Sequence, residues 1–364
     1  MKLVHVVYSL HIGGLERVLV NCVNRLPSNI EHHIVCLTDY SDSFSNLLPD
    51  NTKLYRLGKK SGKDFSVYKR FFKLLKSIKP DVVHTYNLAT NELQFIAWLA
   101  RVPVRIHAEH GRDIYDPEGK VTKYRVLRKC LVHFTSKVVA VSGELYSWLK
   151  DDLALPKKKV VLIRNGINTE FFVPSSKPRE AFNIGHVGRL SPIKNQRLLL
   201  QGYALACEND EAFAHSTTLT IVGDGESADE LKTLSESLCI TENVNFAGAQ
   251  MDVLKFYQSF DCFVMTSTAE GIPMTLLEAM SCGVAAAVTP VGGMPEVVND
   301  EVGYLFATSN KEESVANTLL ALWRNKGKTA SLGVNARKRI EQLFSEQAMV
   351  NQYQELYGLN NVRD

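Results

Sequence analysis

The chain has 364 residues, of which 45% are hydrophobic and 22% charged, and its formal net charge is +3. This length suits two domains of ordinary size, and so small a net charge gives no reason to expect a nucleic acid partner. The seven cysteines are scattered without a C-x-x-C pair, which argues against a disulfide scaffold or a zinc site and favours a reducing compartment. No apolar stretch approaches the roughly 18 residues of a transmembrane helix, and the apolar start is too short for a signal peptide. We therefore expect a cytoplasmic protein, at most peripheral on a membrane face.

Strand and helix signals alternate along the first half of the chain, a pattern typical of α/β folds with parallel sheets. An amphipathic segment at residues 59–79 gathers its apolar side chains on one broad face and its lysines on the other. The predicted strands lie at residues 3–9, 33–38, 81–85, 104–107, 137–141 and 160–163, and the predicted helices at residues 15–25 and 92–100.

The same alternation begins again after residues 172–181, a proline- and serine-containing stretch without periodicity that we predict to be a linker. Two similar α/β halves are expected to bind ligands at the carboxyl ends of their strands. In the second half the predicted strands lie at residues 183–188, 218–222, 244–246, 262–265 and 285–289, and the helices at residues 197–207, 229–238, 251–259, 314–324 and 346–357.

One stretch of the second half, residues 266–283, carries two glutamates, Glu270 and Glu278. Pro273 can occupy the first position of a helix, and Gly283 stands where a helix end favours a left-handed residue. Ionised carboxylates accept pairs of hydroxyl groups, so the two glutamates suit sugar and ribose hydroxyls. The backbone at the predicted helix start offers N–H groups to a phosphate; this segment comprises Gly271, Ile272, Pro273, Met274 and Thr275.

Two cations, Arg189 and Lys194, follow another predicted strand. A planar guanidinium and a lysine point charge can stabilise the negative charge that grows on a departing diphosphate, without a metal ion. The alternative is that both are ordinary surface cations. Gly223 and Gly225 lie in a turn that also fits a loose dinucleotide fingerprint, but no carboxylate ends a strand about 20 residues later, so this signal is weak.

These motifs resemble those of one enzyme family. Glu270 and Glu278 with the intervening Gly-Ile-Pro-Met-Thr-Leu-Leu are similar to the E-x7-E element of retaining GT-B glycosyltransferases, the large family that includes sucrose synthase and bacterial mannosyltransferases. Arg189 and Lys194 match its G-R-L-x-x-x-K element, and residues 223–226 its G-D-G-x turn. The resemblance implies an α/β GT-B fold of two Rossmann-like domains facing across a cleft, at residues 1–171 and 182–345, with residues 346–364 crossing back to the first domain.

The resemblance also implies roles for these residues. Arg189 and Lys194 would neutralise the diphosphate of a nucleotide-diphosphate sugar, Glu270 would hold sugar hydroxyls, and Glu278 would hold the ribose. The turn with Gly223 and Gly225 would lie near the base and ribose. The implied reaction is transfer of the sugar, with retention, to a saccharide or lipid-linked acceptor.

In the first half, Gly13 and Gly14 form a turn. Because glycine has no Cβ atom, the backbone of this turn can come close to a ligand. The alternative is an ordinary turn between a strand and a helix. His110 falls where related enzymes carry a histidine beside the transferred sugar, and His107 is the rival position. Residues 8–16, 80–85 and 109–113 resemble a narrower group, the sugar transferases of exosortase-associated exopolysaccharide loci.

The sequence contains no D-x-D triplet of the kind that metal-binding glycosyltransferases need. We therefore expect no metal and no cofactor beyond the nucleotide sugar, which is a co-substrate. Two alternatives stay open: a non-catalytic protein that binds sugar nucleotides or serves as a membrane scaffold, and a nicotinamide-dependent oxidoreductase that uses the turn at residues 223–228.

Basic residues concentrate in the first half and raise the possibility of an anionic membrane partner. Cations close to such a surface each contribute about 1 kcal/mol. The alternative is that they form the solvated faces of two helices. The two basic stretches comprise Lys59, Lys60, Lys63, Lys69, Arg70, Lys73, Lys76 and Lys79, and then Lys120, Lys123, Arg125, Arg128 and Lys129.

Overall fold

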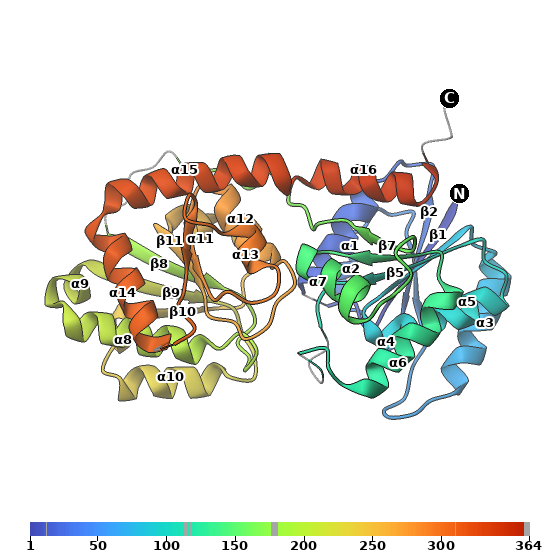
Figure 1. Cartoon of the computed structure of the whole chain (residues 1–364), viewed down its shortest axis with the longest axis horizontal. Helices are drawn as coiled ribbons and strands as arrows, with labels where there is room; N and C mark the ends of the chain where they lie inside the picture. Colours follow the sequence, from blue (N-terminus) through green and yellow to red (C-terminus); the bar gives the residue numbers. More distant parts are fainter. Residues whose placement is uncertain (12, 113–115, 117, 176–180, 310, 360–364) are drawn as a thin grey trace. The chain divides into compact units, whose positions relative to one another are not determined.

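The computed structural model describes residues 1–11, 13–112, 116, 118–175, 181–309 and 311–359. The chain divides into two compact units, Met1–Asn165 with Glu346–Asp364, and Gly166–Ser345 (Figure 1). The first of the two segments that form the first unit therefore ends at Asn165 rather than at the predicted residue 171. Residues 172–175 of the predicted linker belong to the second unit, where Ser281 Oγ donates to the Phe172 carbonyl at 2.8 Å and Gln258 Nε2 donates to the Val173 carbonyl at 2.9 Å. Residues 176–180 of that linker lie outside the described residues.

The described part of the first unit contains a seven-stranded sheet in the order β3-β2-β1-β4-β5-β6-β7. All neighbouring strands run parallel. The central strands are buried on both faces, as parallel sheets covered by helices require, and are mostly apolar with buried histidines among them. The strands are β1 (Lys2–Val7), β2 (Glu31–Cys36), β3 (Lys53–Arg56), β4 (Val82–Tyr86), β5 (Val104–Glu109), β6 (Lys137–Ala140) and β7 (Val160–Leu162).

Helices cover this sheet, and the last helix of the chain, α16 (Glu346–Leu356), belongs to the same unit. Arg25 Nε donates to Glu346 Oε2 at 2.9 Å, and the Tyr357 hydroxyl lies 2.7 Å from His84 Nδ1. These contacts fasten the end of the chain to the first sheet. The other helices are α1 (Gly14–Arg25), α2 (Asp42–Ser45), α3 (Ser66–Ile78), α4 (Leu88–Asn91), α5 (Leu93–Leu99), α6 (Thr122–Leu131), η1 (Val132–Phe134), α7 (Gly143–Ser147) and η2 (Trp148–Asp152).

The second unit repeats this plan around a six-stranded parallel sheet of described residues in the order β10-β9-β8-β11-β12-β13. Its strands are β8 (Phe182–Val187), β9 (Thr217–Val222), β10 (Val244–Gly248), β11 (Cys262–Met265), β12 (Ala285–Val288) and β13 (Gly303–Leu305). Its helices are α8 (Gln196–Asn209), α9 (Glu211–Ser216), α10 (Ala228–Ser237), η3 (Thr241–Asn243), α11 (Leu254–Ser259), α12 (Met274–Ser281), α13 (Met294–Val297), α14 (Lys311–Arg324) and α15 (Lys326–Leu343).

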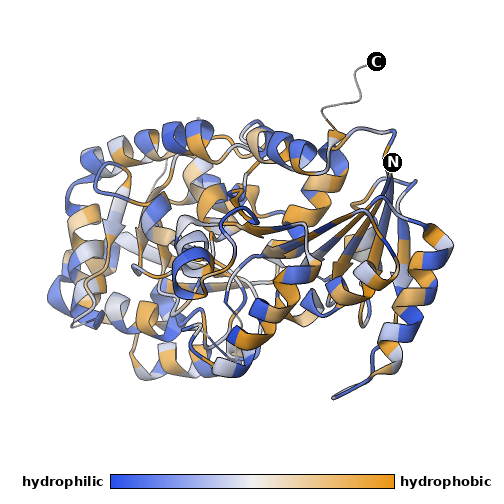
Figure 2. Cartoon of the chain, turned by 45° about the vertical axis from the view of Figure 1, so that its right-hand side comes forward, coloured by the Kyte–Doolittle hydropathy of each residue, from blue (hydrophilic) through white to orange (hydrophobic). Residues whose placement is uncertain are grey.

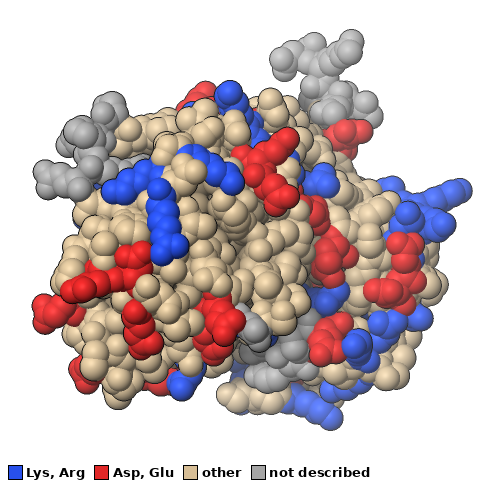
Figure 3. All heavy atoms as spheres, turned by 60° about the vertical axis from the view of Figure 1, so that its left-hand side comes forward, with Lys and Arg blue, Asp and Glu red and all other residues tan. Residues whose placement is uncertain are grey.

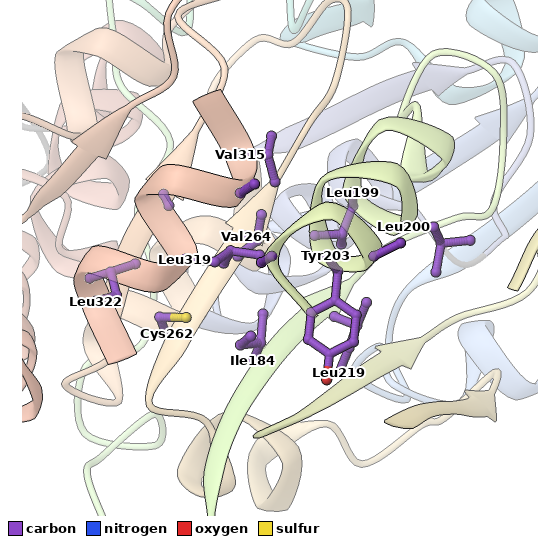
Figure 4. Close-up of a cluster of buried hydrophobic side chains, with 14 of the residues drawn as sticks. Ile184, Leu199, Leu200, Tyr203, Leu219, Cys262, Val264, Val315, Leu319 and Leu322 are labelled. Carbon is purple, nitrogen blue, oxygen red and sulfur yellow. The ribbon is translucent and has the colours of Figure 1, made fainter. Parts of the chain in front are cut away.

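Each unit has its own core. In the second unit, Leu199 and Tyr203 of α8 pack with Leu219 of β9 and with Val315 and Leu319 of α14 (Figure 4). Around the helices, orange and blue residues alternate in Figure 2, as expected for helices that lay one face on a sheet and turn the other to solvent. The face drawn in Figure 3 mixes acidic and basic side chains.

Three local predictions need correction. The amphipathic segment predicted over residues 59–79 is helical only from Ser66, because the Asp64 carboxylate binds the backbone N–H groups of Lys60 and Ser66 in a turn before the helix. Pro273 precedes α12 as its N-cap, with an extended ψ of 127°, instead of being its first helical residue. Arg128, counted with the surface cations, is only 3% exposed and pairs with Glu109.

Candidate active site

In the second unit, the loops that follow β8 and β11 meet at the carboxyl edge of the sheet, where these two strands are neighbours. Thr268 N donates to the Ile193 carbonyl at 2.8 Å, and Thr266 Oγ1 donates to the Asn195 carbonyl at 2.8 Å. These bonds fix the loop with Lys194 against the loop with Glu270. Open parallel sheets bind ligands at this edge.

Lys194 and Glu270 form an ion pair in this corner. Lys194 Nζ lies 2.5 Å from Glu270 Oε1, with side chains 21% and 11% exposed. Ser267 Oγ donates to the same oxygen at 2.8 Å. Both hydrogen bonds that the described residues donate to this carboxylate use Oε1, and Oε2 receives none from them. A carboxylate held in this way can accept a hydroxyl group through its second oxygen.

Arg189 lies in the loop directly after β8 and is exposed. The Arg189 carbonyl accepts a hydrogen bond from Gln196 Nε2 at 2.9 Å, and Gln196 Nε2 also lies 3.0 Å from Nε2 of the buried His186. Burial lowers the pKa of His186 to about 4, so this supporting imidazole is neutral near pH 7. The backbone is thus fixed, while the guanidinium makes no hydrogen bond or ion pair to another described residue. It is therefore available to an anionic ligand.

The turn with Gly223 and Gly225 lies against the Arg189 loop. Gly223 has φ +142°, and a Cβ atom there would come within 1.9 Å of the Gly188 carbonyl oxygen. Gly188 N donates to the Val222 carbonyl at 2.9 Å, and Leu190 N to the Asp224 carbonyl at 3.0 Å. Only glycine permits this close approach, so the turn and the Arg189 loop form one rigid rim.

The start of α12 completes this rim. Gly293 N donates to the Gly271 carbonyl at 2.8 Å, and a Cβ on Gly292 (φ +56°) would come within 1.8 Å of the Glu270 carbonyl oxygen. Gly292 therefore lets the turn after β12 support the backbone that carries Glu270. The prediction of a left-handed Gly283 after the helix is confirmed, since its φ is +73°. Gly271, Ile272, Pro273 and Met274 are buried, and Thr275 is half-buried.

Glu278 lies on α12 and is 6% exposed. The Tyr257 hydroxyl of α11 donates to its Oε2 at 2.6 Å. This bond orients a carboxylate that would be costly to bury alone. No pattern in the sequence relates Tyr257 to Glu278, because their contact depends on the packing of two separate helices.

In the first unit, the structure distinguishes the two candidate histidines. His107 uses both ring nitrogens inside the protein: Nδ1 lies 2.8 Å from Thr85 Oγ1, and Nε2 lies 3.4 Å from Glu109 Oε1. The ring nitrogens of His110 are both buried and have no partner among the described residues. Burial lowers the pKa of His110 to about 3, and the neighbouring Glu109 opposes this shift only in part. His110 is therefore a neutral imidazole with one donor and one acceptor that no described residue uses.

A third residue holds His110 in place. His110 follows β5, and its backbone N–H donates to Asn87 Oδ1 at 2.7 Å. Asn87 follows β4, the neighbour of β5. Gly13 and Gly14 stand at the start of α1, the first helix after β1, which is the other neighbour of β4. The predicted residues of this unit therefore lie at one edge of its sheet, and sequence reasoning missed Asn87.

No group of three His, Cys, Asp or Glu side chains among the described residues is arranged to hold a metal ion. Within each unit, the structure brings the predicted residues together at one sheet edge. Ser267, Tyr257, Gln196 and Asn87 support them and were not predicted. Ser267 lies three residues before Glu270. Of these four supporting residues, it is the one whose short spacing from its partner could be found in the sequence.

Comparisons with known proteins agree on the family. The model of glycosyl transferases group 1 matches residues 168–339, and the model of Glycosyltransferase Family 4 matches residues 12–171. An Escherichia coli UDP-Gal:alpha-D-GlcNAc-diphosphoundecaprenol alpha-1,3-galactosyltransferase is 27% identical, over 98% of this chain and 96% of that protein. A Campylobacter jejuni N,N'-diacetylbacillosaminyl-diphospho-undecaprenol alpha-1,3-N-acetylgalactosaminyltransferase is 25% identical, over 84% of each chain.

Among solved structures, Anabaena HepE in complex with UDP-glucose superposes with a TM-score of 0.83, at 22% identity, over 99% of this chain and 100% of that one. The nicotinamide-dependent alternative is wrong, because both family models that match the chain describe glycosyltransferases. With the two models together covering nearly the whole chain and the fold matching as well, the chain belongs to the group 1, family 4 glycosyltransferases and has the GT-B fold.

Proposed function

We propose that this protein transfers a sugar, with retention, from a nucleotide-diphosphate sugar to a lipid-linked or saccharide acceptor in surface glycan biosynthesis. One observation carries the proposal: at a single sheet edge, an Arg189 guanidinium that pairs with no described residue and the Lys194–Glu270 pair lie in loops bonded to each other. The names of the Escherichia coli and Campylobacter jejuni relatives support a diphospho-undecaprenol-linked acceptor. The complex of Anabaena HepE supports a uridine nucleotide donor.

In the proposed reaction, Arg189 and Lys194 neutralise the diphosphate as its bond to the anomeric carbon breaks, and the N–H groups at the start of α12 assist. Glu270 and His110 bind hydroxyls of the transferred sugar. Glu278 binds the ribose. The acceptor hydroxyl attacks from the face that the diphosphate leaves, and a leaving phosphate oxygen takes the hydroxyl proton, so no enzyme nucleophile is required.

The backbone turns complete the proposed site. Gly223 and Gly225 bring their turn to the base and ribose, and Gly13 and Gly14 bring theirs to the phosphates and acceptor. The place of this reaction in an exosortase-associated exopolysaccharide locus stays a prediction from residues 8–16, 80–85 and 109–113.

Donor binding can be tested by thermal unfolding with a panel of nucleoside diphosphates. A ligand that binds only the folded protein raises its melting temperature. We expect UDP to raise it more than uridine does, because the diphosphate is the part that Arg189 and Lys194 bind. Equal shifts for uridine and UDP would contradict the assignment of the phosphate site.

Metal removal gives a separate prediction. We expect full transfer activity in excess EDTA, since the proposed site stabilises the diphosphate with a guanidinium, an ammonium group and helix N–H groups. The assay compares initial rates before and after chelation. A rate that falls with EDTA and returns with magnesium or manganese would show that a metal ion takes part.

We further propose that the first unit attaches to an anionic membrane surface, which would bring the enzyme to a lipid-linked acceptor. No helix among the described residues is long and apolar enough to cross a bilayer. Instead, α3 exposes Lys69, Lys73 and Lys76. Helix α5 lies next to α3 (Figure 1). Its residues Trp98 and Leu99 are 46% and 45% exposed. Lysines and an exposed tryptophan side by side suit the charged and interfacial layers of a bilayer.

The structure narrows the cations available for this contact. Arg70 pairs with Asp64 at 2.8 Å, Arg128 is buried, and Lys59 Nζ binds the Lys60 and Gly62 carbonyls. Lys76 Nζ also donates to the Ala100 carbonyl at 3.3 Å. The proposal rests on the exposed lysines of α3, and the exposed Lys123 and Lys129 of the second basic stretch can add to the same charge.

Reversing Lys69, Lys73 and Lys76 to glutamate should abolish sedimentation with phosphatidylglycerol liposomes, because each cation near such a surface contributes about 1 kcal/mol. The matched control reverses Lys326, Lys328 and Lys338, which are exposed on α15 of the second unit. Binding that persists in the α3 variant, or that does not increase with anionic lipid, would rule this surface out.

A further inference from the structure

Asn87 has a backbone conformation that its side chain makes unfavourable. Its φ is +57° and its ψ is 170°, a combination that almost only glycine adopts. It differs from an ordinary left-handed residue such as Lys79, with φ 52° and ψ 63°, which ends α3. Strain of this kind persists where the surroundings enforce it, and it concentrates at functional sites.

The surroundings of Asn87 enforce this conformation from several sides. Its backbone N–H donates to the Ala108 carbonyl at 2.8 Å, and its carbonyl accepts from Thr90 N at 3.2 Å. Its side-chain Oδ1 accepts the backbone N–H of His110 at 2.7 Å. A glycine would keep both backbone hydrogen bonds without strain. The sequence nevertheless places a side chain here, so the amide itself must contribute something that glycine cannot.

The orientation of this amide follows from its partner. A backbone N–H can bond only to the oxygen, so the amide nitrogen Nδ2 points the other way. Nδ2 has no hydrogen-bond partner among the described residues, and Asn87 is half-buried at the carboxyl end of β4. Directly beside it lies His110, whose two ring nitrogens also have no described partner. Two polar side chains with unused groups therefore stand together at the ligand-binding edge of this sheet.

We propose that Asn87 is a substrate-binding residue, whose Nδ2 donates a hydrogen bond to a hydroxyl of the sugar that His110 contacts. Its Oδ1 at the same time fixes the backbone of His110. The inference rests on the proposed sugar transfer and adds a residue that selects for a hydroxyl group at one position of the sugar. The strained backbone is the cost of directing the amide at the ligand.

The strain is tested by comparing Asn87→Gly with Asn87→Ala. Both variants lack the amide and differ mainly in their tolerance of positive φ. Elsewhere alanine is usually the more stabilising of the two. At this position we expect the glycine variant to melt about 2–6 °C above the alanine variant. A glycine variant that melts at or below the alanine variant would show that the site is not strained.

The ligand contact is tested with Asn87→Asp, which keeps an oxygen for the His110 N–H and removes the donor. We expect kcat/KM for sugar transfer to fall about tenfold or more, the usual scale for a lost substrate hydrogen bond, while the Kd for UDP alone stays unchanged. The control is Ala154→Gly, at an exposed residue of the same unit with φ +52°, which should keep the wild-type kcat/KM.

The outcomes separate this inference from the proposed function. A wild-type protein that transfers no sugar contradicts the function itself. A wild-type protein that transfers sugar, together with an Asn87→Asp variant of equal kcat/KM, contradicts only the assignment of Asn87. A variant that loses UDP binding and sugar transfer in parallel would show a general structural role instead of a contact with the sugar.

Discussion

Replacing Arg189 or Lys194 with alanine is expected to lower the rate of sugar transfer by about 10²- to 10³-fold, the usual scale for losing one contact that stabilises developing charge. Both variants should remain folded. Arg189 is exposed, and its hydrogen bonds to the described residues use only its backbone. Lys194 is 21% exposed, and its loss leaves Glu270 bonded to Ser267. The measurement is the initial rate of nucleoside diphosphate release with a saturating acceptor.

The control for this prediction is Arg197→Ala. Arg197 lies in the same unit, is 53% exposed and pairs with Glu230, so its removal changes the net charge equally but leaves the proposed diphosphate site intact. We expect the wild-type rate from this variant. Wild-type rates from Arg189→Ala or Lys194→Ala would remove both residues from the proposed mechanism.

Mild acid is expected to unfold the first unit before the second. His5, His32 and His84 are at most 3% exposed, and burial lowers the pKa of each below the usual 6.5, to about 4 for His32. Below pH 6.5 the unfolded chain binds protons that the folded unit excludes, so the free energy of unfolding falls as the pH falls towards the folded pKa values. Three such residues together lose about 3 kcal/mol of stability between pH 6.5 and pH 5.5, against about 1 kcal/mol for the buried His186 of the second unit.

Hydrogen exchange followed by mass spectrometry, corrected for the intrinsic effect of pH, can check this prediction. Peptides of β1, β2 and β4 should lose protection at pH 5.5 while peptides of β8 and β11 keep theirs. His32→Phe should reduce the acid sensitivity, since neither ring nitrogen of His32 has a described partner. His215→Phe, at a side chain that is 78% exposed, should leave it unchanged. Simultaneous loss of protection in both units would contradict the prediction.

Much of the fold could be predicted because its strands are apolar runs separated by glycine and proline. The helix that carries Glu278 was found in this way, from Pro273 and Gly283. By contrast, α15 was missed, because its buried residues Leu332, Ala336 and Ile340 stand among many polar ones and two glycines. The short edge strands β3 and β13 were also missed, since their partly exposed residues form no apolar run.

The charged residues of the candidate site could be identified from sequence because motifs of fixed spacing hold them. Their supporting contacts could not. Glu278 and Tyr257 lie on two different helices, and His110 and Asn87 follow two different strands. Each hydrogen bond therefore depends on tertiary packing. In the sequence, the preference for His110 over His107 rests on resemblance, since His110 falls where related enzymes carry a histidine beside the transferred sugar. The structure gives the preference for His110 a physical basis, since both ring nitrogens of His107 bind protein partners.

Transfer of a sugar by the purified full-length chain tests the central claim most directly. The protein is incubated with a panel of nucleotide-diphosphate sugars and polyprenyl-diphosphate-linked acceptors, and the products are analysed by mass spectrometry. We predict that one donor adds a single sugar to the acceptor with release of an equal amount of nucleoside diphosphate, and that Arg189→Ala prevents it. Tight binding of a nucleotide sugar without transfer or donor hydrolysis across the panel would contradict the claim and indicate a non-catalytic binding protein.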